Sequence, residues 1–87
     1  MPKVHANSDE LRGFAGQLEK FNQDLNSMKS HIESRFNGLD WNDPAYRKFE
    51  GQFKQTMAVL KRFIDDSPQH VRLLKKKADE LDQFLHG

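Results

Sequence analysis

The stretch LRGFAGQLEKFNQDLNSMKSHI, residues 11–32, decides the fold because its large apolar residues recur at alternating steps of three and four. This spacing keeps apolar side chains on one side of an α-helix. Asn7 or Ser8 can cap the start of the helix, and Gly38 can end it by taking the left-handed backbone conformation. The sequence therefore predicts a first helix over residues 8–37. Its apolar stripe is Leu11, Phe14, Leu18, Phe21, Leu25, Met28 and Ile32.

A second helical pattern begins at Asp43 and Pro44, where aspartate caps the first turn and proline takes the first helical position. The apolar period continues almost to the C-terminus, with a polar gap at Ser67. Pro68 can either kink this helix or separate two helices. Because the stripe resumes in phase after Pro68, we expect one kinked helix over residues 44–86. The core residues expected on this helix are Phe49, Phe53, Leu60, Ile64, Leu74 and Leu81.

The turn between the two helices, residues 38–43, is short enough to force them to lie side by side and antiparallel. The chain of 87 residues is therefore expected to form one all-α domain, an antiparallel two-helix hairpin. A lone hairpin of this length buries little apolar surface, and a chain without cysteine has no disulfide to stabilise it. We therefore expect dimerisation into a four-helix bundle, with a second copy or a paralogous hairpin as the partner.

The sequence offers no set of residues that fits an enzyme. The four histidines are not spaced along one helical face, and Asp65 and Asp66 are neighbours that point to different sides of a helix. We therefore predict a non-enzymatic protein with no catalytic residue, no metal and no cofactor.

The net charge of +1 gives no overall attraction to nucleic acid or an anionic membrane. Residues 72–77 form the one basic cluster, in which Arg72, Lys75 and Lys76 are the candidate polyanion contacts. Acidic residues follow at once, so a solvated face is favoured and neither nucleic acid nor membrane is the expected partner. The alternative function is an intracellular coiled-coil interaction protein that binds nucleic acid or a membrane surface through this cluster.

The N-terminal residues lack the apolar stretch of a secretory signal peptide. We therefore expect the protein to be cytoplasmic as synthesised, and any export to use a route that needs no such peptide.

Trp41 lies in the predicted turn, where its ring can cover the end of the helical bundle or dock against a partner. The two roles are compatible.

The segment WNDPAYRKF, residues 41–49, resembles the signature of the WXG family, the early-secreted-antigen-like proteins of about a hundred residues. In that signature a tryptophan and a glycine two residues later mark the turn of a helical hairpin, followed by an alanine and a phenylalanine. Trp41, Ala45 and Phe49 match the signature, whereas Asp43 stands where the family usually has glycine. Aspartate caps a helix at least as well as glycine, so the substitution keeps the physical role.

The resemblance implies a homodimer or heterodimer of hairpins that acts as a secreted factor, an export substrate or an escort in a type VII-like secretion system. Exported members often carry a tyrosine followed four residues later by an acidic residue, just past the second helix. Here the only tyrosine is Tyr46. If that signal is needed, the protein would have to borrow it from a partner, such as a secreted effector, or would not be exported.

Overall fold

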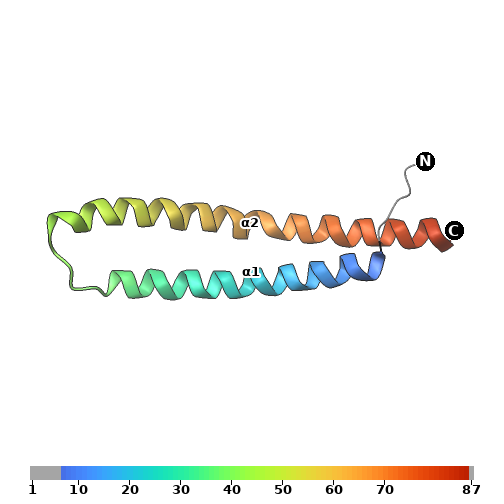
Figure 1. Ribbon diagram of the computed structural model, residues 1–87, viewed down its shortest axis with the longest axis horizontal. Helices are drawn as coiled ribbons and strands as arrows, with labels where there is room; N and C mark the ends of the chain where they lie inside the picture. Colours follow the sequence, from blue (N-terminus) through green and yellow to red (C-terminus); the bar gives the residue numbers. More distant parts are fainter. Residues whose placement is uncertain (1–6, 87) are drawn as a thin grey trace.

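The computed structural model describes residues 7–86 as two antiparallel helices, α1 (Ser8–Asn37) and α2 (Pro44–His86), joined by a short turn (Figure 1). All regular secondary structure in this part of the chain is helical, so the expected all-α hairpin is confirmed. The molecule is a rod about 65 Å long. α2 extends beyond α1 at both ends (Figure 1). We call the end with the turn the turn end and the other the open end.

The first helix is capped by Asn7 and not by Ser8. The side-chain oxygen of Asn7 accepts hydrogen bonds from the backbone N–H groups of Asp9 and Glu10, at 2.9 and 3.3 Å. The two acidic residues also place negative charge at the positive end of the helix dipole.

At the other end of α1, the left-handed conformation predicted for Gly38 is wrong. Gly38 has φ −89° and ψ 0°, which is right-handed. Its N–H donates to the carbonyl oxygens of Ser34 and Arg35, and the N–H of Leu39 donates to that of Phe36. Because this tightened last turn already satisfies terminal carbonyl groups, the chain needs no left-handed residue there.

Asp43 caps α2, as the sequence predicts. Its side-chain oxygen accepts hydrogen bonds from the backbone N–H groups of Ala45 and Tyr46, at 2.9 and 3.2 Å. Further along, α2 continues through Pro68 as one helix and is not divided into two.

Replacing Asp43 by alanine should lower the free energy of unfolding by about 1 kcal/mol, because two backbone N–H groups lose their acceptor. Asp43→Gly, which introduces the residue of the WXG signature, should lower the free energy of unfolding by only a few tenths of a kcal/mol, or roughly 0.3 kcal/mol. Urea denaturation followed by circular dichroism measures both losses. Asp40→Ala, at an exposed position in the same turn, is the control. A loss as large for Asp40→Ala as for Asp43→Ala would contradict the capping role.

The helices meet along a line of buried and half-buried residues that we call the seam. The seam residues follow one another at steps of three and four, apart from one step of seven between Lys29 and Phe36, and on α2 the pattern continues through Ser67 and past Pro68. This is the repeat of a coiled coil. On α1 the seam consists of Leu11, Ala15, Leu18, Asn22, Leu25, Lys29 and Phe36. On α2 it consists of Tyr46, Glu50, Phe53, Met57, Leu60, Ile64, Ser67, Val71, Leu74, Ala78 and Leu81.

The predicted apolar stripe of the first helix therefore divides into two sets within the single chain. Leu11, Leu18 and Leu25 lie in the seam. The other four members, Phe14, Phe21, Met28 and Ile32, are at least 50% exposed. On α2, the predicted core residues Phe53, Leu60, Ile64, Leu74 and Leu81 lie in the seam, whereas Phe49 lies beside it and is exposed. Smaller residues such as Ala15 occupy the seam, and the large side chains next to them face outward.

Candidate functional site

One side of the hairpin carries a row of exposed large apolar side chains, which we call the apolar flank. On α1, Phe14, Phe21 and Met28 recur every seven residues, so they lie on one side of the helix. The rings of Phe21 and Phe63 meet edge to face at 6.2 Å, which joins the rows of the two helices. The apolar flank consists of Phe14, Phe21, Met28, Ile32, Phe49, Phe63 and Phe84.

The opposite side is closed by ion pairs between the helices, and we call it the charged flank. Arg12 pairs with Asp79 at 2.7 Å and with Asp82 at 2.6 Å, and Lys75 pairs with Glu19 at 2.6 Å. The hydrogen bonds to Asp79 and Asp82 raise the pKa of the Arg12 guanidinium. These pairs are exposed to solvent, which screens the attraction, so each stabilises the hairpin only weakly.

The seven-residue repeat of the two helices places these two flanks on opposite sides of the seam. Arg12 and Glu19 each follow a seam leucine by one residue. Phe14 and Phe21 instead precede the seam residues Ala15 and Asn22 by one residue. The hairpin thus satisfies its charged flank internally and leaves its apolar flank exposed.

Five aromatic rings gather at the turn end, and we call them the turn cluster. Phe36 is 7% exposed and its ring lies 4.6 Å from that of Phe53 and 5.6 Å from that of Tyr46. Trp41 is half-buried, with its ring 5.5 Å from that of Tyr46 and 5.7 Å from that of Phe49. Trp41 therefore packs against the start of α2, as a lid on the end of the hairpin would.

The remaining contacts of the turn motif hold the start of α2. The hydroxyl of Tyr46 donates to a carboxylate oxygen of Glu50 at 2.8 Å, and this hydrogen bond raises the pKa of Tyr46. Asp43 caps the helix, whereas Ala45 is exposed. Of the four residues of the predicted turn motif, Trp41 and Phe49 thus belong to the turn cluster. No local pattern places Phe36 at the centre of this cluster, since Phe36 lies outside the regular apolar stripe of the first helix.

A polar layer crosses the middle of the seam. The side-chain amide of Asn22 donates a hydrogen bond to the hydroxyl of Ser67, and both side chains are buried. The side-chain oxygen of Asn22 is buried, and no atom of residues 7–86 donates a hydrogen bond to it. Ser67 therefore fills the predicted polar gap in the stripe. A buried polar pair of this kind favours one alignment of the helices over shifted ones.

The basic cluster does not form a separate cationic patch. Lys75 is engaged by Glu19 on the charged flank, and Arg72 and Lys75 line a cleft together with Glu19. Lys76 and Lys77 are exposed and follow on other sides of α2. Asp79 and Asp82, which follow the cluster, are bound to Arg12.

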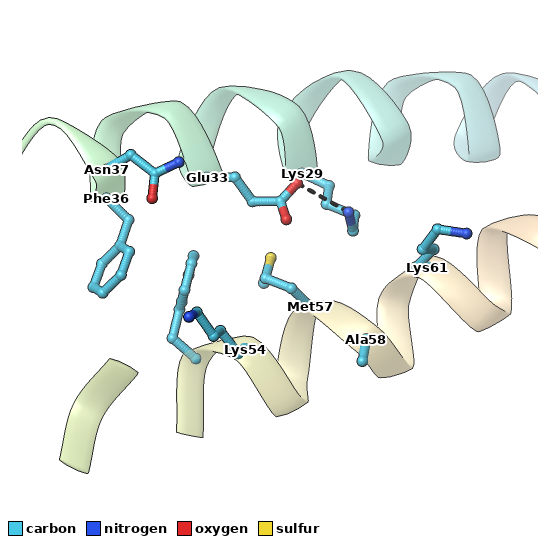
Figure 2. Close-up of a pocket in the computed structure, with 9 residues that line it drawn as sticks. Lys29, Glu33, Phe36, Asn37, Lys54, Met57, Ala58 and Lys61 are labelled. Carbon is cyan, nitrogen blue, oxygen red and sulfur yellow. Dashed lines mark hydrogen bonds and ion pairs between the residues drawn. The ribbon is translucent and has the colours of Figure 1, made fainter. Parts of the chain in front are cut away.

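A second cleft opens on the charged flank near the turn end, and we call it the turn cleft (Figure 2). Its volume is about 310 Å³. Phe36 from α1 and Met57 from α2 point into it, and Lys29, Glu33 and Lys54 stand around its edge (Figure 2).

Within residues 7–86, no group of three or more histidine, cysteine or acidic side chains is arranged to hold a metal ion. Neither α1 nor α2 is long and apolar enough, over its described residues, to cross a membrane.

No protein-family profile, curated protein or solved structure matches the chain.

Proposed function

We propose that this protein works by docking and not by catalysis, with the apolar flank as its interface and a second copy of the chain as its first partner. One observation carries the proposal: the seven members of the apolar flank are at least 39% exposed, while on the opposite flank ion pairs join the two helices toward the open end. Large contiguous apolar surfaces on small proteins mark interaction sites. Burying this flank against a copy would produce the four-helix bundle that the short chain favours.

The arrangement of residues along α1 favours an antiparallel copy. Phe14 and Met28 lie seven residues on either side of Phe21. If two apolar flanks face each other with the α1 helices crossing near Phe21, Phe14 of each copy meets Met28 and Ile32 of the other. Such a two-fold arrangement uses the same surface on both chains.

Exposed charges beside the apolar flank support the same arrangement. With the crossing near Phe21, Glu10 lies opposite Arg35 of the second copy, and Asp24 lies opposite Lys20. The structure gives none of these four side chains an ion-pair partner within residues 7–86. Opposite charges at the rim of an interface guide two surfaces into one register.

In the cell, this dimer acts as a WXG-like adaptor: a secreted factor, an export substrate or an escort of a type VII-like secretion system. The resemblance of residues 41–49 to the WXG signature supports this role, together with the packing of Trp41 at the turn of a helical hairpin. The mechanism is packing of apolar surfaces.

Replacing Phe21 by glutamate should dissociate the dimer, because a two-fold interface would bring two carboxylates together at its centre. We expect the dissociation constant to rise by at least about a hundredfold. Sedimentation equilibrium measures it. Helical content by circular dichroism should stay near that of the wild type, because Phe21 is 53% exposed in the single chain.

Asn26→Glu is the matched control, because it adds the same charge at an exposed position on the same helix, one residue after the seam residue Leu25 and hence on the charged flank. This variant should remain dimeric. A wild-type protein that sediments as a monomer at high concentration, or a Phe21→Glu variant that dimerises as the wild type does, would rule out the apolar flank as the interface.

A further inference from the structure

The turn cleft lies on the side of the hairpin away from the proposed dimer interface. Lys54 and Lys61 each follow a seam residue by one position, as Lys75 does, so all three lie on the charged flank. The cleft is therefore a feature separate from the apolar flank. A dimer built through the apolar flanks leaves one turn cleft open on each chain.

The charged flank differs between its two halves. Near the open end, ion pairs join α1 to α2 through Arg12 and Lys75. Around the turn cleft, each ion pair of the described lysines joins residues of the same helix: Lys29 with Glu33, Lys54 with Glu50 and Lys61 with Asp65, at 2.9, 4.0 and 2.8 Å. Ion pairs therefore bridge the two helices in the half toward the open end. In the half toward the turn end, the cleft between the helices is accessible to a ligand.

The lining of the turn cleft combines an apolar floor with a basic edge. Phe36, Phe53 and Met57 provide the floor, and Ala58 lines it with a side chain too small to fill it. Three lysines stand at the edge against one glutamate, Glu33. The side chains of Lys54 and Lys61 are 73% and 68% exposed, so both ammonium groups are accessible. A ligand for this cleft needs apolar and negatively charged groups together.

We infer that the turn cleft docks an acidic amphipathic helix of a partner protein. Lys54 and Lys61 are seven residues apart, which is two helical turns or about 10.5 Å along α2. A helix lying along the groove has the same repeat, so carboxylates at its positions i and i+7 meet the two lysines. An apolar side chain between those carboxylates, at i+3 or i+4, reaches Phe53 and Met57.

The apolar floor favours such a helix over a nucleic acid. A phosphate backbone would use the lysines but leave the apolar side chains of Phe36, Phe53 and Met57 unused. An acidic helix uses both parts of the lining. This inference names a second kind of partner, and it does not require the chain to be dimeric.

Fluorescence anisotropy with a labelled synthetic peptide tests the inference on the full-length protein. The peptide is an amphipathic helix with glutamates seven residues apart and leucines between them. The wild-type protein should bind it, and a peptide with glutamines in place of the glutamates should bind at least about tenfold more weakly.

Charge reversal at the cleft provides the decisive comparison. The variant Lys54→Glu/Lys61→Glu should lose at least about tenfold in affinity for the acidic peptide. It should gain affinity for a peptide with lysines at the same two positions. The control Lys48→Glu/Lys76→Glu makes the same change in net charge at exposed positions that do not line the cleft, and it should bind as the wild type does.

The variant Phe21→Glu separates this site from the proposed dimer interface, and it should bind the acidic peptide as the wild type does. Three results would overturn the inference: no binding of the acidic peptide to the wild type, equal binding to the Lys54→Glu/Lys61→Glu variant, or binding of a single-stranded RNA at the same cleft with equal affinity.

Discussion

Replacing Phe36 by alanine is expected to lower the free energy of unfolding by about 3–5 kcal/mol, the usual range for removing a buried aromatic ring. Phe36 is 7% exposed and contacts the rings of Tyr46, Phe49 and Phe53. Its removal would open a cavity at the point where α1 is joined to the start of α2. Urea denaturation at one fixed protein concentration measures the loss.

Leu39→Ala is the control for this prediction. Leu39 lies at the same end of the molecule but is 55% exposed, so its truncation should change the free energy of unfolding by less than about 0.5 kcal/mol. If Phe36→Ala and Leu39→Ala proved equally stable, the turn cluster could not be the anchor of the hairpin.

Replacing Pro68 by alanine is expected to raise the free energy of unfolding by about 2 kcal/mol. Proline inside a helix costs about 3 kcal/mol relative to alanine, because it has no N–H to donate to the carbonyl of the residue four positions earlier. Up to about 1 kcal/mol of this gain is lost because alanine gives the unfolded chain more freedom. Pro68 is exposed, so its removal leaves no cavity. Thermal denaturation should show a higher midpoint.

Gln69→Ala provides the comparison, because Gln69 is exposed in the same turn of α2 and already has an N–H. Its effect should stay within about 0.5 kcal/mol. A Pro68→Ala variant no more stable than Gln69→Ala would contradict the prediction that Pro68 destabilises α2.

Much of the fold can be predicted from local signals. Asp43 and Pro44 mark the start of α2 because a capping carboxylate and a proline at the first helical position act within one turn. The length of the turn then leaves only an antiparallel hairpin. The conformation of Gly38 could not be predicted in this way. The choice between a left-handed residue and a tightened last turn depends on which carbonyl groups the next residues can reach.

The seam could be predicted only in part, because Leu11, Leu18 and Leu25 fit two stripes equally well. One stripe adds Phe14, Phe21 and Met28, and the other adds Ala15, Asn22 and Lys29. Size and hydrophobicity favour the first stripe, and the described hairpin uses the second. A helix that packs against two neighbours needs apolar residues on more than one side. The sequence alone does not show which of the two stripes packs against the other helix of the same hairpin.

The candidate sites depend on contacts between residues far apart in the chain. The pairing of Arg12 with Asp79, and of Asn22 with Ser67, joins positions that no local pattern connects. The turn cleft likewise forms only when Phe36 and Met57 are brought side by side. Residue types alone could identify a basic cluster at residues 72–77, but not that Glu19 engages one of its lysines.

The two ends of the rod are fastened by forces that respond differently to the solvent. The ion pairs of Arg12 and Lys75 lie toward the open end, and ionic strength screens attraction between exposed charges. The stacked rings at the turn have no such sensitivity. In concentrated electrolyte the open end should therefore lose the small contribution of these ion pairs and rely on the buried Ala15, Val71 and Ala78, whereas the packing around Phe36 should be unaffected.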